Sequence, residues 1–227
     1  MFKTIKKHIK LFLFIFLILI LNILFNYTNQ FQIIEIIYQV LSFLTIIGIA
    51  IYYVNKFDNV TLKSFTCPLT KIYTRNKYFN IMEIEIKRSE RTNGNLSAIF
   101  FDIDNFASIN TKLGHYTGDR VLIDMVNSIK ECLRSYDIFA RVGGEEFSVL
   151  MPETDVNEAY LIAERIRKHV NTIKVGKGLE LTISIGVTTL KQEDTPLDIY
   201  KRMDDAMYVS KNKGKNQTTI WDNSVVK

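Results

Sequence analysis

The chain is poor in the residues that build disulfide scaffolds and zinc sites. Its 227 residues include two cysteines, three prolines and one tryptophan. Cys67 and Cys132 lie far apart in the sequence and lack the close spacing of zinc ligands. We expect both thiols to lie in a reducing compartment, where disulfides are rare. The sequence therefore excludes a disulfide-rich scaffold and predicts no structural zinc site.

The chain has a modest excess of positive charge, and most of that excess lies near the N-terminus. The formal net charge is +5 at pH 7. Residues 1–66 hold six lysines against Glu35 and Asp58, a balance of +4 that leaves +1 for the rest of the chain. A surface that binds nucleic acid would carry its positive charge on the folded domain. We therefore expect no nucleic-acid polymer among the partners.

Two long apolar runs, at about 9–27 and 33–54, stand near the N-terminus. Each approaches the ~20 residues that cross a bilayer as a helix. A cleaved signal peptide is the alternative for the first run, but no small-x-small cleavage site follows it. A buried helical hairpin is the alternative for the pair, but residues 11–21 offer no polar face. We expect residues 1–54 to form a membrane anchor with two transmembrane helices.

Lysines flank these runs at their outer ends only. Four lysines precede the first run, none lies in the short connector, and Lys56 and Lys63 follow the second run. The positive-inside rule then makes both termini cytoplasmic, in a multi-pass protein of the inner (plasma) membrane. The linker, residues 55–66, contains no proline or glycine. A helix can therefore continue from the second run towards the last predicted domain, residues 67–227.

Glycine is also sparse, which makes the pair Gly143-Gly144 informative. The segments on either side are apolar and β-branched, so the pair predicts a β-hairpin whose two turn residues both have positive φ. Glu145 and Glu146 follow at once. A divalent cation is one natural partner for two carboxylates beside a buried strand. The alternative is a solvated hairpin with two surface glutamates.

A second acidic cluster follows another buried-strand pattern. Residues 96–101 lead directly into Asp102 and Asp104, which lie on one face because side chains alternate along a strand. Carboxylates at the end of a buried strand, near hairpin carboxylates, are typical of a Mg²⁺ site with oxygen ligands. Between the two clusters, the apolar spacing predicts one helix over residues 118–135, which would join two adjacent antiparallel strands.

Six stretches of the chain resemble the GGDEF family of diguanylate cyclase domains, in the family's order and spacing. They are PLT (68–70), FDIDNFASIN (101–110), GHYTGD (114–119), RVGGEEFSVLMPET (141–154), ISIGV (183–187) and AMYVSKNKGKN (206–216). The resemblance spans about residues 65–221, with the glycine pair in a GGEEF variant. It implies an α/β (α+β), palm-like domain with a central, mostly antiparallel sheet flanked by helices.

The resemblance implies phosphoryl transfer, in which the 3′-hydroxyl of one GTP attacks the α-phosphate of another. The product is cyclic di-GMP, with release of pyrophosphate. By resemblance, Asp102, the backbone carbonyl of Ile103 and Glu145 hold Mg²⁺ (or Mn²⁺), and a two-metal arrangement suits attack and departure. Glu145 and Glu146 are the implied catalytic carboxylates. Glu146 either joins the metals or takes the hydroxyl proton. Asp104 more often has a structural role in the family.

The resemblance also implies contacts with the substrate. The amides of Asn105 and Phe106 would cradle phosphates, and Gly144 would let the substrate approach the backbone closely. Asn110 and Asp119 match the positions that read guanine. Their alternatives are a helix cap for Asn110 and a favourable first-turn charge for Asp119.

Two lysines match residues that reach the triphosphate. Lys211 and Lys215 lie at the end of a helix that the sequence predicts from Thr195-Pro196 to Gly214. Their alternative is ordinary compensation of the helix dipole. The family often has arginine where Lys215 stands, so the charge is kept while the bidentate geometry is lost.

Arg134-Ser135-Tyr136-Asp137 matches the family's inhibitory product site, an RxxD motif. Arginine can stack on guanine or fork onto it, while the aspartate accepts from its N1 and N2 groups. Arg165 aligns with a secondary arginine of that site; its alternative is a solvent-facing arginine on a helix. Because the product is two-fold symmetric and each domain offers one GTP site, the resemblance implies a homodimer with facing hairpins.

The chain departs from the family pattern at two places that matter. Cys67 stands where the family has an aspartate that pairs with the residue matching Arg75. Ala107 stands where the family usually has a lysine that stabilises charge on the transferring phosphate. Two hypotheses of different class follow: a membrane-anchored diguanylate cyclase, or a weakly active or inactive GGDEF domain that senses cyclic di-GMP or GTP.

Overall fold

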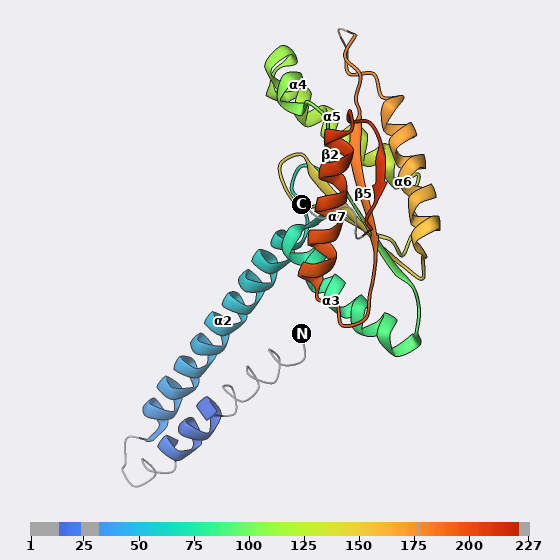
Figure 1. Ribbon diagram of the computed structural model, residues 1–227. Coiled ribbons are helices and arrows are strands. Elements are labelled where there is room, and N and C mark those ends of the chain that lie inside the picture. The colour runs from blue at the N-terminus through green and yellow to red at the C-terminus, as the bar shows by residue number, and fades with distance from the viewer. Residues whose placement is uncertain (1–13, 24–31, 177, 223–227) are drawn as a thin grey trace. The chain divides into compact units, whose positions relative to one another are not determined.

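The computed structural model describes the backbone of residues 14–23, 32–176 and 178–222. The chain divides into two compact units, Met1–Asn59 and Val60–Lys227. Figure 1 shows the helices of the first unit and the mixed α/β domain of the second.

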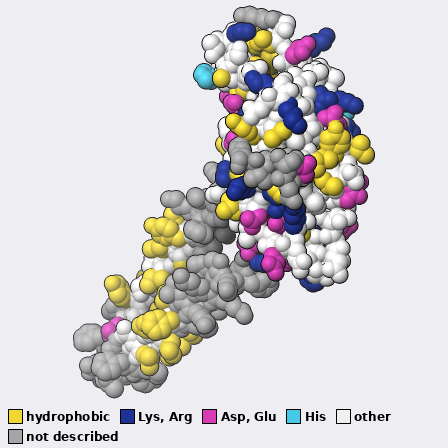
Figure 2. Space-filling view, in the orientation of Figure 1, with side chains coloured by type: hydrophobic (Ala, Val, Ile, Leu, Met, Phe, Trp, Pro, Cys, Tyr) yellow, Lys and Arg dark blue, Asp and Glu magenta, His cyan; other side chains and the backbone are white. Residues whose placement is uncertain are grey.

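The first unit consists of apolar helices. Helix α2 (Gln32–Phe65) contains the stretch Glu35–Tyr53, which has the length and composition of a membrane span and is not buried. Hydrophobic side chains cover its described part in Figure 2. Within the described residues it is the single helix of that kind, so two transmembrane helices are not confirmed. Of the predicted run 9–27, only the short apolar helix Phe14–Ile23 is described, and the rest lies outside the described residues.

The two helices touch within this unit, and α2 runs on beyond it. The rings of Phe16 and Phe43 lie with their centroids 6.3 Å apart. Helix α2 is unbroken to Phe65 and so includes the predicted linker, residues 55–66, except its last residue. The absence of proline and glycine from this stretch explains that continuity.

A six-stranded sheet forms the centre of the second unit, in the order β1-β3-β4-β2-β5-β6. The inner pairings β3–β4, β4–β2 and β2–β5 are antiparallel, and the short outer strands β1 and β6 pair in parallel. The predicted mixed α/β fold with a mostly antiparallel sheet is therefore confirmed. The bounds are β1 Tyr73–Thr74, β2 Leu96–Ile103, β3 Ile138–Arg141, β4 Glu146–Pro152, β5 Ile183–Thr189 and β6 Thr218–Ile220.

Helices cover both faces of this sheet, and the alternation along β2 supplies the core on each side. Ile99, Phe101 and Ile103 face a core shared with α4 (Phe106–Leu113), α5 (His115–Lys130) and α6 (Val156–Asn171). Leu96, Ala98 and Phe100 face a second core shared with α3 (Arg75–Thr92) and α7 (Pro196–Asn212). Because Asp102 continues the second set, the strand period places it on the α7 side.

The helical segment between β2 and β3 differs from the prediction. Two helices, α4 and α5, occupy it, and α5 ends at Lys130 rather than near Ser135. Gly114, with φ of 85°, separates them. The apolar stripe of α5 is buried as predicted, whereas Leu133 packs on the same core from beyond the helix. The helix predicted over residues 118–135 left residues 106–113 without an element, and α4 occupies them.

Helix α7 begins and ends as predicted, and it packs unusually close to β5. Thr195 caps it in a capping box with Asp198, and Pro196 is its first residue. At Gly186 in β5, an added Cβ would lie 2.0 Å from the carbonyl oxygen of Met203 in α7. Glycine at this position is therefore required for the close approach of α7 to the sheet.

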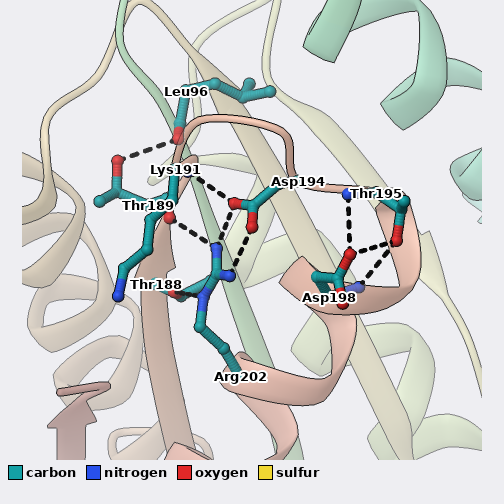
Figure 3. A network of polar contacts seen from close by, with 8 residues as sticks. All are labelled: Leu96, Thr188, Thr189, Lys191, Asp194, Thr195, Asp198 and Arg202. Atoms are coloured by element: carbon teal, nitrogen blue, oxygen red, sulfur yellow. Dashed lines mark hydrogen bonds and ion pairs between the residues drawn. The ribbon is translucent and has the colours of Figure 1, made fainter. Parts of the chain in front are cut away.

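A buried ion pair fixes the start of α7 (Figure 3). Arg202 donates to both carboxylate oxygens of Asp194, with NH1 2.7 Å from Oδ1, and also to Thr188 and the carbonyl of Thr189. Both charged side chains are nearly buried, and each nitrogen of the guanidinium donates to at least one acceptor. Leu96, at the opposite end of β2 from Asp102, accepts from Thr189 Oγ1 in the same network. The network holds the helix that carries Lys211 in a fixed position along the sheet.

Candidate active site

The carboxylates of the site meet where β2 ends and β4 begins. Asp102 is the pairing partner of Glu146 across β2–β4 and of Ser184 across β2–β5. Its side chain is almost fully buried, and burial raises the pKa of its carboxyl. Lys211 opposes that shift, because its Nζ lies 2.9 Å from Oδ2 of Asp102. The sheet register thus brings together residues that are distant in the sequence.

The glycine pair forms the predicted hairpin but not with the predicted backbone. Neither Gly143 nor Gly144 has positive φ, so the expectation of a two-residue turn was wrong. Strands β3 and β4 are joined by a longer loop, closed by bonds from the amides of Val142 and Gly143 to the carbonyl of Glu146 (2.9 and 3.2 Å). Spreading the reversal over more residues removes the need for left-handed backbone.

Each glycine has a different structural reason. A Cβ at Gly143 would lie 2.0 Å from Oε2 of Glu146, so the missing side chain makes room for that carboxylate. Gly144 is open on its side-chain face, and its carbonyl accepts from Nε (3.1 Å) and NH2 (2.5 Å) of Arg141. The carboxylate of Glu146 therefore lies against Gly143, and the backbone at Gly144 has no side chain covering it.

Glu145 and Glu146 are half-buried and share the field of Asp102. Burial raises the pKa of both carboxyl groups, and the charge of Asp102 raises both further. The carbonyl of Glu145 accepts from the amide of Ile103 at 3.3 Å. The side chain of Ile103 lies in the core, so it can reach the site only through its backbone. The site is therefore rich in negative charge that Lys211 compensates only in part.

These residues fit a hard divalent cation by their chemistry. Within residues 14–23, 32–176 and 178–222, no group of three His, Cys, Asp or Glu side chains is already gathered as a metal cluster. The donors on hand are carboxylate and carbonyl oxygens, which Mg²⁺ prefers. The carboxylates of Asp102, Glu145 and Glu146 repel one another, and a divalent cation would relieve that repulsion. Asp102, Glu145 and the carbonyl of Ile103 are the residues that would hold it.

Asp104 lies beside Asp102 and has a different environment. Its oxygens accept from Thr182 Oγ1 (2.8 Å), Ser184 Oγ (2.7 Å) and the amide of Asn216 (3.0 Å). The side chain is 4% exposed. Its hydrogen-bonding capacity is directed at the protein, which agrees with a structural role.

The residues expected to contact phosphate lie where α4 begins. Asn105 has φ of 56° and precedes Phe106, the first residue of α4. Nζ of Lys215 lies 2.5 Å from Oδ1 of Asn105. Lys211 and Lys215 therefore approach the site from two sides, one at Asp102 and one at Asn105. Dipole compensation alone would not direct two lysines onto these particular side chains.

Asn110 lies on α4 against Gly118 of α5, the residue that precedes Asp119. Asn110 lies inside α4 and caps neither end, and Asp119 lies beyond the first turn of α5, so both simple alternatives are wrong. A Cβ at Gly118 would lie 1.9 Å from Oδ1 of Asn110. That oxygen is buried and has no hydrogen-bond partner within the described residues. An unsatisfied buried acceptor beside an exposed aspartate is the arrangement that a base with adjacent N–H groups would complete.

Arg134, the first residue of the RxxD motif, borders a separate hollow of about 450 Å³. Arg134 and Arg165 both line it, and Arg134 is ion-paired with Glu158 from the first turn of α6. Arg165 donates to the carbonyl of Cys132 at 2.5 Å, so it is not simply a solvent-facing arginine. Asp137 accepts from the amide of Arg134 at 2.8 Å, and its Oδ1 is buried with no hydrogen-bond partner within the described residues.

From the sequence, neither Asp204 nor Arg75 was placed beside the carboxylates. The charge of Asp204, on α7, raises the pKa of the carboxyls of Asp102 and Glu146, after burial and the nearer charges. Its position seven residues before Lys211, on the same helix face, was the available signal. Arg75 lies with its guanidinium 5.0 Å from the ring centre of Tyr200 and lowers the pKa of Glu146 slightly among larger raising effects.

The two departures from the family pattern also have defined places. Cys67 is buried, and NH1 of Arg141 lies 3.5 Å from its Sγ. Arg75, whose family partner is missing, lies instead over the rings of Phe79 and Tyr200. Ala107 is an exposed residue in the first turn of α4. The chain therefore has no charged side chain at the position where the family has a lysine.

Comparison with known proteins identifies the family. The sequence model of the family described as diguanylate cyclase, GGDEF domain, matches residues 64–217 of this chain. The chain is 38% identical over 162 residues to a probable diguanylate cyclase, DgcT, of Escherichia coli, covering 68% of this chain and 35% of that protein. It is 37% identical over 171 residues to the response regulator PleD of Caulobacter vibrioides, covering 73% and 38%. The chain belongs to the GGDEF family of diguanylate cyclase domains.

Solved structures give the same result for the fold. The active GGEEF domain of a diguanylate cyclase from Vibrio cholerae aligns with a TM-score of 0.64 at 32% identity, covering 66% of this chain and 97% of that one. The GGDEF domain of DgcB from Caulobacter crescentus, in complex with c-di-GMP, aligns with a TM-score of 0.65 at 26% identity, covering 69% and 92%. The chain spans less than half the length of these two curated relatives.

Proposed function

We propose that this protein is a diguanylate cyclase that condenses two GTP into cyclic di-GMP and releases pyrophosphate. The observation that carries the proposal is that Asp102, Glu145 and Glu146 lie together where β2 ends and β4 begins, beside Lys211. Phosphoryl transfer needs this combination of fixed negative ligands and nearby positive charge.

Each residue has a proposed task. Asp102, Glu145 and the carbonyl of Ile103 would hold Mg²⁺ (or Mn²⁺), which neutralises charge on the reacting phosphate. Glu146, held inward over Gly143, would assist at the metals or accept the proton of the attacking hydroxyl. Lys211 and Lys215 would bind the triphosphate, with the amides of Asn105 and Phe106.

Recognition of guanine is proposed at the α4–α5 junction. The unsatisfied Oδ1 of Asn110 and the carboxylate of Asp119 would accept from the amino and N1 groups of the base. Gly144 leaves its side of the hairpin open to the substrate. Since each domain would hold one GTP, the active species would be a two-fold homodimer with facing hairpins.

Substitution of Glu145 tests the catalytic proposal. The full chain, purified in detergent, is incubated with GTP and Mg²⁺, and cyclic di-GMP is measured by chromatography. Wild type should form product, and Glu145→Ala should lose at least about 10²-fold in rate, because a missing carboxylate weakens charge neutralisation at the metals. Glu153→Ala, which removes an exposed glutamate beyond β4, should keep the wild-type rate. Equal rates for Glu145→Ala and wild type would contradict the assignment.

A binding module is the second candidate, and Ala107 is the observation that favours it. Without the family's lysine, the domain would bind cyclic di-GMP or GTP with little turnover. Restoring that lysine with Ala107→Lys should raise the rate of an active enzyme by about 10-fold or more. Asn127→Lys, which adds the same charge on the exposed face of α5, is the matched control. No product from wild type, together with cyclic di-GMP binding by calorimetry, would favour the sensor.

We further propose that residues 1–54 anchor the protein in the plasma membrane through two spans. The unburied apolar stretch Glu35–Tyr53 and the apolar helix Phe14–Ile23 support this. Both termini would then be cytoplasmic, where GTP is available. A reporter fused after Lys227 should therefore register as internal. An external signal from that reporter would contradict both the topology and the enzymatic proposal.

A further inference from the structure

The turn that follows α7 has an unfavourable backbone. Gly214, Lys215 and Asn216 are consecutive residues with φ of 113°, 63° and 47°. Glycine adopts this region freely, but in lysine the Cβ crowds the following carbonyl oxygen. Two such residues in a row persist only where surrounding contacts hold them, and such conformations gather at functional sites. The contacts that hold this turn therefore indicate its purpose.

Hydrogen bonds hold Asn216 from two sides. Oδ2 of Asp104 accepts from its backbone amide at 3.0 Å, and Asp104 is itself fixed by Thr182 and Ser184. On the other side, NH1 of Arg167 donates to Oδ1 of Asn216 at 2.8 Å. Both backbone and side chain of Asn216 are thus committed, and the left-handed turn has little freedom to relax.

Three hydrogen bonds hold the guanidinium of Arg167 in one orientation. Its Nε and NH2 each lie 2.8 Å from one oxygen of Glu164, the residue one helical turn before it on α6. Oε1 of Glu164 also accepts from Oγ1 of Thr218 at 2.7 Å. The two charged side chains are only 17% and 20% exposed. A planar fork used on three acceptors cannot be replaced by the point charge of a lysine.

The turn brings Lys215 to the phosphate end of the site. Its Nζ lies 2.5 Å from Oδ1 of Asn105, just before α4. The side chain of Lys215 is long and flexible, so its direction depends on where the turn places its Cα. The contacts of Asn216, the next residue, therefore decide where the ammonium group can reach.

We propose that Arg167 is a positioning residue for the substrate site: by holding Asn216 it fixes the strained turn that directs Lys215 onto the triphosphate of GTP. This inference rests on the proposed function, because GTP is its ligand. Arg167 lies on α6, outside the motifs that match the family, and its hydrogen bonds go to Glu164 and Asn216. Its effect on nucleotide binding must therefore pass through Lys215.

A double-mutant cycle on the full chain in detergent tests this. The probe is 3′-deoxy-GTP with Mg²⁺, which cannot cyclise, and its affinity is measured by calorimetry. Arg167→Gln and Lys215→Ala should each weaken binding about 5- to 20-fold. The double variant should bind no more weakly than Lys215→Ala alone, because the losses of affinity from two coupled residues are not additive. Arg167→Lys should fall between wild type and Arg167→Gln. Lys168→Gln, an exposed neighbour on α6, should bind as wild type does.

Asn216→Gly separates positioning from folding. Glycine relieves the left-handed strain while it removes the acceptor of Arg167, so this variant should stay folded and still lose affinity. Losses that add in the double variant would show a general structural role and overturn the inference, as would wild-type affinity in Arg167→Gln and Asn216→Gly. Absence of 3′-deoxy-GTP binding by wild type would instead overturn the proposed function, and this inference with it.

Discussion

The ammonium nitrogen of Lys211 lies 2.9 Å from Oδ2 of Asp102, so a lysine on α7 compensates a buried carboxylate of the site. The other charges near Asp102 are mostly negative: Asp204, Glu145 and Glu146 all act on the same small region. The stability and the chemistry of the site therefore depend on the same ion pair.

Loss of that ion pair should destabilise the domain. Lys211→Met keeps the apolar stem but leaves Asp102 buried without its partner. We expect a loss of about 2 kcal/mol in the free energy of unfolding, between the values for exposed and fully buried pairs. Thermal unfolding of the variant should also respond more strongly to added Mg²⁺ than that of wild type, because a bound cation would replace the missing charge. Unfolding temperatures equal to wild type, with and without Mg²⁺, would contradict this.

A side chain at Gly186 should separate α7 from the sheet. In Gly186→Ala the new Cβ would meet backbone atoms of Met203 and Met207 at 2.0 and 2.3 Å, and backbone cannot turn aside as a side chain can. We expect a loss of about 3 kcal/mol or more in stability. Gly144→Ala is the matched control, since an added Cβ there meets nothing within 4 Å and the backbone has no positive φ. Similar melting temperatures for both variants would show that α7 packs more loosely than the structure indicates.

Removal of Arg134 should uncouple product binding from catalysis. Arg134→Ala should weaken the affinity for cyclic di-GMP by about 10-fold or more, as expected for loss of a charged contact, and relieve product inhibition without lowering the initial rate. Calorimetry and progress curves measure the two effects. Arg88→Ala, which removes an exposed arginine on α3, is the control. Equal affinity in wild type and Arg134→Ala would show that the RSYD stretch is only a turn between helix and strand.

Asp137 should make stability depend on pH. Burial raises the pKa of its carboxyl, although the amide of Arg134 acts in the opposite direction. An acid whose pKa is higher in the folded state stabilises the fold while protonated, and this contribution is lost as the pH rises through the folded pKa. Asp137→Asn removes the titration and keeps an acceptor for the amide of Arg134. The variant should therefore unfold at a higher temperature than wild type at pH 7.5, with a difference that shrinks as the pH falls. A difference that grows towards acid pH would reverse the assigned sign.

Local patterns in the sequence were sufficient for much of the fold. The apolar run 96–101 is part of β2, the stripe of α5 is buried, and α7 starts at the predicted capping residue. These features depend on period and capping, which neighbouring residues encode. Helix α4 escaped prediction because eight residues hold too few apolar positions to show a period. The backbone of the hairpin was predicted wrongly because a glycine can be needed for two reasons. It can allow positive φ, or, as at Gly143, it can leave room for a neighbouring side chain such as Glu146.

The sequence by itself determined the family, the strand that ends in Asp102 and the hairpin that carries Glu145 and Glu146, because these are contiguous motifs. Only the tertiary structure decided that Lys211 pairs with Asp102 and that Arg167 holds Asn216. Those contacts join residues far apart in the chain, and they exist because the register of β2 with β4 and β5 and the close packing of α7 on Gly186 bring them together. No local pattern carries that information, since it depends on how whole elements pack against one another.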